Sequence, residues 1–112
     1  MFANMYGLDN LIAFIDCNGY QIDGAVSDVM NPHPVDEKFR AFGWFAQVID
    51  GHDFEQIEAA FAEAKAVKGK PTAIVAKTVK GKGVSFMENK VNWHGAAPND
   101  EQCALALAEL NA

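Results

Sequence analysis

At 112 residues, the chain is long enough for one domain and too short for two. Half of its residues are apolar and 21% are charged, which is the balance of an ordinary globular protein, and a formal net charge of −6 argues against nucleic acid as a partner. No apolar run approaches the length of a transmembrane helix, and the N-terminus lacks the basic start of a signal peptide. We therefore expect a cytoplasmic protein with no membrane partner.

The cysteines set a further limit on the kind of site. Cys17 and Cys103 are two thiols in a chain that does not look secreted, so we expect both to be reduced. They show neither the Cys-x-x-Cys spacing nor the Cys/His spacing of a zinc site. A structural zinc centre is therefore not expected.

The first strand is expected at Leu11–Ile15, where the sequence Leu-Ile-Ala-Phe-Ile suits a strand buried on both faces of a parallel sheet. It ends in the polar turn residues Asp16, Asn18 and Gly19. In open α/β sheets, ligands bind just outside the carboxyl ends of the strands. An oxygen-bearing side chain at this point is where a ligand to a metal or phosphate is expected.

The same residues allow a simpler interpretation, because Asn-Gly is a common tight turn with no further role. A calcium-binding EF-hand is excluded, since counting from Asp16 puts Gln21 and Ser27 where that loop needs Gly and Glu. From the residues alone, both a turn and a ligand site remain open.

The later elements are predicted from apolar spacing and from turn residues. A two-proline linker, Asn31–Pro34, is followed by a helix at Val35–Phe42 that stops at Gly43, a strand at Trp44–Ile49, a helix at Phe54–Lys68 stopped by Gly69 and Pro71, a strand at Thr72–Thr78, a loop at Val79–Pro98 and a final helix opening at Asn99. The helix at 54–68 is expected to have an apolar face of Phe54, Ile57, Phe61 and Ala64, and the final helix one of Cys103, Leu107 and Leu110. Asp53 with Gln56, and Asn99 with Gln102, have capping-box spacing. This order predicts an α/β fold, a parallel sheet with flanking helices in one domain over residues 1–112.

A lysine-glycine segment, Lys77–Gly83, follows the last predicted strand. Such a loop can offer N–H groups and positive charge to a phosphate. It is not a P-loop, because the Gly-x-x-x-x-Gly-Lys-Ser/Thr spacing is absent. Taken by itself, the segment is expected to be a solvated, flexible surface loop.

The histidines differ in what surrounds them. His94 lies in the loop sequence Trp-His-Gly-Ala-Ala-Pro, and a lone loop histidine is usually an ordinary surface group. His52 follows the turn at Gly51 and is expected to be structural or peripheral, and His33 lies between two prolines as a linker residue. Asp16 either orients the turn around Asn18 or is a simple strand-end aspartate.

Three segments in order resemble the transketolase family: Ile-Asp-Cys-Asn-Gly-Tyr-Gln-Ile-Asp-Gly near Asn18, Lys-Thr-Val-Lys-Gly-Lys-Gly after the last strand, and His-Gly-Ala-Ala-Pro at His94. The likeness extends from about Leu8 to Leu110 and is greatest to the N-terminal subunit of transketolases split over two polypeptides. It implies the C-terminal part of a thiamine-diphosphate-binding domain. Deoxyxylulose-phosphate synthases share the lysine-glycine segment and are the related alternative.

The resemblance implies site residues one by one. Asn18 would give its side-chain oxygen to Mg²⁺, and Tyr20 its backbone carbonyl, which suits a cation that prefers hard oxygen ligands. Ile22 would pack near the cofactor. His94 would bind the cofactor diphosphate and handle protons on the substrate hydroxyls, for which a pKa near neutrality is suitable.

The implied reaction is transfer of a two-carbon ketol unit from a ketose phosphate to an aldose phosphate, with thiamine diphosphate and Mg²⁺. The Gly-Asp-Gly half of the family's cofactor motif, which carries the aspartate ligand, is absent from the sequence, and the activating glutamate belongs to a separate pyrimidine-binding domain. Met1–Leu8 resembles the tail of a helix between the half-motifs, so the domain is expected to be incomplete. We therefore expect either a transketolase part that needs a pyrimidine-binding subunit, in a homo- or hetero-oligomer, or a non-catalytic interaction module.

Overall fold

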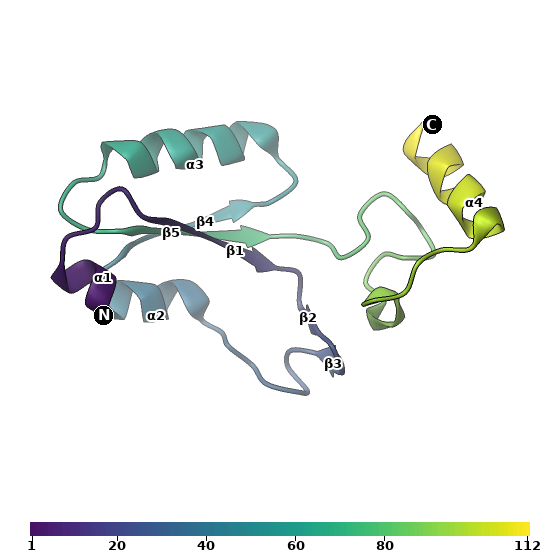
Figure 1. Cartoon of the computed structure of the whole chain (residues 1–112), viewed down its shortest axis with the longest axis horizontal. Helices are drawn as coiled ribbons and strands as arrows, with labels where there is room; N and C mark the ends of the chain where they lie inside the picture. Colours follow the sequence, from purple (N-terminus) through teal and green to yellow (C-terminus); the bar gives the residue numbers. More distant parts are fainter. The chain divides into compact units, whose positions relative to one another are not determined.

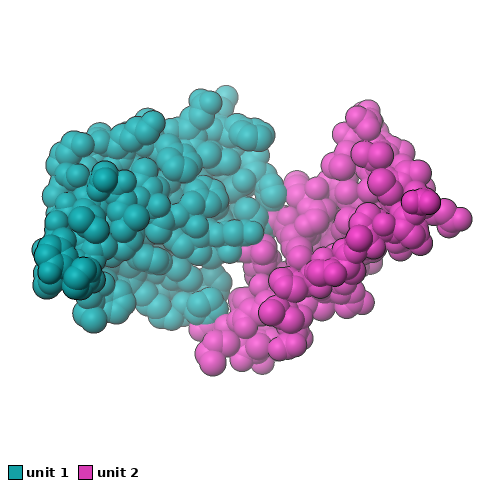
Figure 2. All heavy atoms as spheres, in the orientation of Figure 1, with its two compact units in different colours: residues 1–17, 32–78 teal, residues 18–31, 79–112 magenta.

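The computed structural model describes all of residues 1–112, which divide into two compact units (Figure 2). The sheet unit comprises residues 1–17 and 32–78, and the loop unit comprises residues 18–31 and 79–112. Within neither unit is there a helix that is long and apolar enough to cross a membrane. The chain passes between the units at 17/18, 31/32 and 78/79.

The sheet unit is built on three parallel strands, β1 (Ile12–Cys17), β4 (Phe45–Asp50) and β5 (Thr72–Lys77), in the order β1-β5-β4. Pairing is in register along the whole length of both ladders, from Ile12 opposite Thr72 to Cys17 opposite Lys77. The helix α3 (Phe54–Ala66) covers one face of the sheet, and α2 (Val35–Ala41) lies on the other, next to the short α1 (Phe2–Met5) (Figure 1). The predicted parallel α/β fold with flanking helices is confirmed.

The core lies around the central strand β5, whose residues from Thr72 to Ala76 are all buried. Side chains alternate between the faces of a strand, so Ile74 and Ala76 point to the same side. There they pack with Ile49 of β4 and with Ala60 and Ala64 of α3. The small side chains of Ala60 and Ala64 allow the helix to approach the sheet closely.

Strand β1 corrects one prediction, because it is not buried on both faces: Phe14 and Asp16 are exposed and the other residues are half-buried. The apolar run at Leu11–Ile15 suits a strand covered on both faces, but the strand order places β1 at an edge of the three-stranded sheet. Phe14 stacks on Phe61 of α3, with ring centroids 6.1 Å apart, and still keeps 46% of its surface exposed. An edge strand has a neighbour on one side only, which leaves this surface uncovered.

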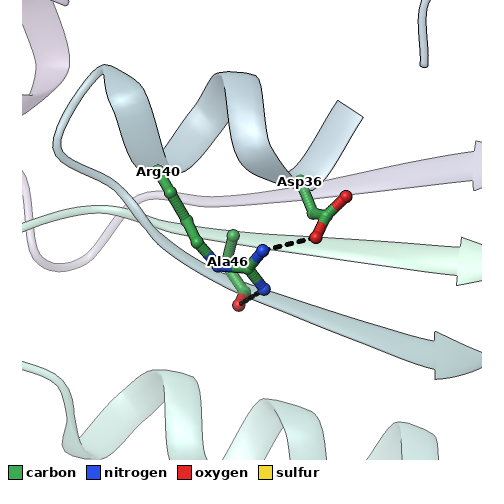
Figure 3. A network of polar contacts seen from close by, with 3 residues as sticks. All are labelled: Asp36, Arg40 and Ala46. Atoms are coloured by element: carbon green, nitrogen blue, oxygen red, sulfur yellow. Dashed lines mark hydrogen bonds and ion pairs between the residues drawn. The ribbon is translucent and has the colours of Figure 1, made fainter. Parts of the chain in front are cut away.

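The helix α2 is tied to the sheet by Arg40. Its guanidinium pairs with the Asp36 carboxylate one helical turn earlier and donates a second hydrogen bond, of 2.9 Å, to the carbonyl of Ala46 in β4 (Figure 3). The Arg40 side chain holds the pKa of the Asp36 carboxyl below its usual range. The chain then turns at Gly43, whose φ of +84° suits glycine, so the predicted stop signal is confirmed.

Helix α3 begins where predicted, with the Asp53 carboxylate accepting hydrogen bonds from the N–H groups of Glu55 and Gln56. Hydrogen bonds from Gln56 and Glu55 hold the pKa of Asp53 below its usual value. The prediction that Phe54 belongs to the apolar face is wrong, because 81% of its surface is exposed. Phe54 is the first helical residue, whereas the other three residues of the predicted face, Ile57, Phe61 and Ala64, belong to the core or pack against it.

The loop unit has little regular structure. Strands β2 (Tyr20–Gln21) and β3 (Gly24–Ala25) form a small antiparallel hairpin, and a 3-10 turn η1 (Val91–Trp93) precedes α4 (Asp100–Leu110). Asn99 and Gln102 form the predicted capping box at the start of α4. Ala106 is the buried residue of this helix, whereas the predicted apolar face of Cys103, Leu107 and Leu110 is exposed.

Candidate functional site

The turn after β1 is held by the side chain of Asn18. Its Oδ1 atom accepts a hydrogen bond of 2.9 Å from the N–H of Tyr20, two residues later, which is an Asx turn. Gly19 between them has a φ of +81°, a conformation that glycine adopts without strain. Asn18 is therefore a turn residue, as the simpler interpretation predicted, and this role leaves the question of a ligand role open.

The same turn offers oxygen atoms to a cation. Oδ1 of Asn18 is an amide carbonyl oxygen, a type of atom that can accept more than one contact. The backbone carbonyl oxygens and side-chain amide oxygens of such a turn are hard ligands of the kind that Mg²⁺ binds, usually together with water and phosphate oxygens. No three side chains of His, Cys, Asp or Glu gather anywhere in the structure in a way that could hold a metal ion. The donor set at Asn18 and Tyr20 fits a hard cation shared with a phosphate ligand and does not fit zinc.

Ile22 follows in the turn of the β2–β3 hairpin, where 70% of its surface is exposed. An exposed isoleucine gains little stability from its own chain, which leaves the side chain available for an apolar part of a ligand. Asn18, Tyr20, Ile22 and His94 all belong to the loop unit.

Three strand ends meet through Thr78, which the sequence did not indicate as a site residue. Its hydroxyl donates a hydrogen bond to the Asp16 carboxylate at the end of β1. Its N–H donates to the carbonyl of Cys17 at 3.4 Å, and the neighbouring carbonyl of Lys77 accepts from Gly51 N–H at 2.7 Å. Asp16 and Thr78 are 62 residues apart in the sequence, so no local pattern reveals the contact.

Cys17 directly precedes this turn but is not suited to be a nucleophile. Burial raises the pKa of its thiol, and the nearby carboxylates of Asp16 and Asp36 raise it further, against the opposing effect of Lys77. The thiol therefore stays protonated near neutral pH, whereas the thiolate is the reactive form. Both cysteines are free, as predicted.

Backbone hydrogen bonds link the lysine-glycine segment to the residues that follow it. Backbone hydrogen bonds join Lys82 to Val79, Val84 to Gly81 and Asn89 to Lys80. A Cβ atom on Gly81, whose φ is +72°, would lie 2.7 Å from the carbonyl oxygen of Met87, so only glycine fits there. Gly83 donates its N–H to the carboxylate of Glu88, so this N–H group, one of those that such a loop can offer to a phosphate, already has a partner.

His94 is an exposed residue that ends the turn η1 and is positioned by its neighbour Trp93. The indole N–H of Trp93 donates to the carbonyl of Phe86 at 3.1 Å, and the two rings pack edge to face. Gly95 follows with a φ of +80°. The imidazole therefore lies at the surface of the loop unit, where a ligand can reach it.

Helix α4 is linked to the loop just after the lysine-glycine segment by Glu109, whose carboxylate accepts hydrogen bonds from both the N–H and the hydroxyl of Ser85. These two bonds hold the pKa of Glu109 below its ordinary value of 4.5. A carboxylate whose pKa is lower in the folded state stabilises that state above its unfolded pKa, and the contribution disappears as the pH falls through the folded pKa.

We therefore expect Glu109→Gln to remove a part of the pH dependence of the folded state's stability below about pH 4.5, the ordinary pKa of this carboxyl. The measurement is amide hydrogen exchange of Ser85 at pH 7 and below pH 4, in the wild type and the variant. Exchange in the wild type should accelerate on acidification beyond the intrinsic pH effect. Glu101→Gln, on the first turn of the same helix, is the matched control, and an equal change in both variants would contradict the assignment.

These features define a class of protein: an open parallel α/β domain with an oxygen-bearing turn at the carboxyl end of a strand, which is where such sheets bind ligands. The family model described as "Transketolase, thiamine diphosphate binding domain" matches residues 1–111. The chain belongs to the transketolase family.

Individual relatives agree with this assignment. The chain is 46% identical over 110 residues to the 6-deoxy-6-sulfo-D-fructose transketolase subunit SqwG of Clostridium sp. (strain MSTE9), and 38% identical over 111 residues to a subunit of the apulose-4-phosphate transketolase of Phocaeicola vulgatus. The crystal structure of transketolase from Campylobacter jejuni is similar with a TM-score of 0.90 at 34% identity, over 98% of this chain and 17% of that one. The match to the two subunits covers 98% and 99% of this chain and about 40% of their length.

Proposed function

We propose that the protein is part of a transketolase that transfers a two-carbon ketol unit from a ketose phosphate to an aldose phosphate, using thiamine diphosphate and Mg²⁺. The observation that carries the proposal is the Asn18 turn at the end of β1, in a chain whose residues 1–111 match the diphosphate-binding domain. The relatives support a sugar carrying an anionic group as substrate, since one is named for a sugar phosphate and another for a sulfosugar.

Each site residue has a binding role in this proposal. Asn18 Oδ1 and the carbonyl of Tyr20 would hold Mg²⁺ against the diphosphate, and Ile22 would pack on an apolar part of the cofactor. His94 would donate a hydrogen bond to the diphosphate and hold or move a proton at the hydroxyls of the sugar. When bound, thiamine diphosphate supplies the group-transfer chemistry, and the protein supplies binding and orientation.

A second polypeptide or domain is part of the proposal. Two of the relatives are named as subunits, and this chain spans about 40% of their length. The free edge of β1, with Phe14 half exposed, has room for further strands. The sequence lacks Gly-Asp-Gly, and we place the glutamate that activates the cofactor on a pyrimidine-binding partner. The isolated chain is therefore expected to bind cofactor without turning over substrate.

The missing Gly-Asp-Gly also favours a second candidate, a non-catalytic module that keeps the fold. The two candidates differ in cofactor binding. A working transketolase part binds thiamine diphosphate in a Mg²⁺-dependent way, and an interaction module does not.

His94→Gln tests the proposed diphosphate contact. We expect about a tenfold weaker affinity for thiamine diphosphate in the presence of Mg²⁺, because one hydrogen bond to a charged group contributes about 1.5–3 kcal/mol. The change in intrinsic tryptophan fluorescence, to which Trp44 and the adjacent Trp93 contribute, gives the dissociation constant. His33→Gln is the matched control in the proline linker. Equal affinities of the two variants would show that His94 is an ordinary surface group.

A further inference from the structure

The two chain segments that carry the candidate site residues start from neighbouring positions in the sheet. The segment with Asn18 begins after Cys17, and the segment with His94 begins after Thr78. The N–H of Thr78 donates to the carbonyl of Cys17, so the two starting points are joined by a backbone hydrogen bond beyond the last strand pair, Cys17 opposite Lys77.

Thr78 is held on two sides. Its hydroxyl donates to the carboxylate of Asp16 on β1. Its methyl group lies over Gly51 at the end of β4, since a Cβ atom built on Gly51 would collide with Thr78 Cγ2. A threonine carries a hydroxyl and a methyl on one carbon, and here each group faces a different neighbouring strand. The rotamer of Thr78 is thus fixed by contacts to both edge strands.

We propose that Asp16, Thr78 and Gly51 form a clamp that fixes the two starting points of the cofactor-binding segments, with Asp16 and Thr78 acting as positioning residues for the Asn18 turn. The inference rests on the proposed function in one respect, namely that Asn18 holds a cofactor metal. The clamp does not touch the ligand. It acts by restricting the segment that begins at Asn18 and the lysine-glycine segment that continues from Val79.

The reason to expect an effect on binding is preorganisation. A site built on segments with fixed starting points has less conformational freedom to lose when the ligand binds. The Asp16–Thr78 hydrogen bond is exposed to solvent and lies outside the core, so its loss should change the mobility of the two segments more than the stability of the sheet. If the hydrogen bond had a purely structural role, its loss would change the stability of the sheet more than the mobility of the two segments.

Three substitutions test the proposal. Thr78→Val removes the clamp hydroxyl and keeps a methyl group over Gly51. Thr72→Val makes the same change at the other end of β5, where the hydroxyl is buried without a hydrogen-bond partner, so it is a matched control with no clamp. Thr78→Ser restores the hydroxyl and should recover most of the wild-type behaviour.

The first measurement is amide hydrogen exchange of the wild type and the three variants without ligand. We expect exchange in residues 18–20 and 79–80 to accelerate at least threefold in Thr78→Val, and to stay within the error of the wild type in Thr72→Val and close to it in Thr78→Ser. Unchanged exchange in Thr78→Val, or the same acceleration in Thr72→Val, would overturn the clamp.

The second measurement is the dissociation constant of thiamine diphosphate in saturating Mg²⁺. Thr78→Val should weaken binding about five- to tenfold, with a melting temperature that changes no more than that of Thr72→Val, and Thr78→Ser should recover it. An unchanged dissociation constant in Thr78→Val, while the wild type binds, contradicts the positioning role. Absence of binding by the wild type itself contradicts the proposed function, and the exchange result then decides the clamp alone.

Discussion

Replacing Ile74 with alanine is expected to lower the free energy of unfolding by about 3–4 kcal/mol, within the range measured for large-to-small substitutions in cores. Ile74 is completely buried in the central strand and packs between Ile49 and the alanines of α3. Truncation leaves a cavity that backbone pairing on both sides of β5 prevents from closing. This is a large part of the total stability of a small domain, which is about 5–15 kcal/mol.

Ile22→Ala is the matched control for Ile74→Ala, because the same atoms are removed where 70% of the side chain is exposed. It should change the free energy of unfolding by no more than about 0.5 kcal/mol. Urea denaturation of both variants measures the difference directly. A loss below about 1 kcal/mol for Ile74→Ala, against the range cited for buried residues, would show that the core is not centred on β5.

Asn18→Ala is expected to weaken Mg²⁺-dependent binding of thiamine diphosphate by about 10–100-fold, the range found when groups that support a bound metal are removed. The same change deletes the acceptor of the Tyr20 N–H, a hydrogen bond worth about 1 kcal/mol. Fluorescence titration at several Mg²⁺ concentrations separates the two effects, because only a metal ligand alters the dependence on Mg²⁺.

Asn18→Asp is the control for the metal role of Asn18. It keeps an oxygen at the position of Oδ1 for both the turn and the cation, so it should retain most of the Mg²⁺ dependence. If Asn18→Ala lowers the melting temperature and leaves the affinity for the cofactor unchanged, Asn18 is a turn residue only. The roles carried over to Asn18 and Tyr20 would then be wrong.

The local signals in the sequence predicted most of the elements. Gly43 and Gly69, both with positive φ, separate α2 from β4 and α3 from β5 as expected. The Asn99–Gln102 box opens α4 at the predicted residue. Caps and turns depend on interactions within a few residues, which is why a single sequence specifies them.

The order of the strands in the sheet could not be predicted from such local signals. The runs around Ile15 and Ile74 are both apolar, yet β1 lies at an edge and β5 at the centre. Which strand receives two neighbours depends on the crossover connections and not on the strand itself. The exposure of Phe14 and Phe54 could not be predicted from local sequence either, because the burial of a side chain depends on which residues pack against it in the fold.

The residues of the candidate site also fall into those that the sequence indicated and those that it did not. Asn18 was found from its place after an apolar strand, and Tyr20, Ile22 and His94 came from the family resemblance. Thr78 was missed because its partner Asp16 is distant in the sequence. The β2–β3 hairpin was also missed, since each of its strands has two residues and carries no periodic pattern.

The most direct test of the account is the melting temperature of the protein with thiamine diphosphate and Mg²⁺ together, with each alone, and with neither. A ligand at about one hundred times its dissociation constant stabilises the native state by about 2.7 kcal/mol. At roughly 4–8 °C per kcal/mol for a domain of this size, that corresponds to a rise of about 10 °C or more. We predict this rise for the combination and little change for either component alone. The same melting temperature in all four conditions would contradict a cofactor site at Asn18.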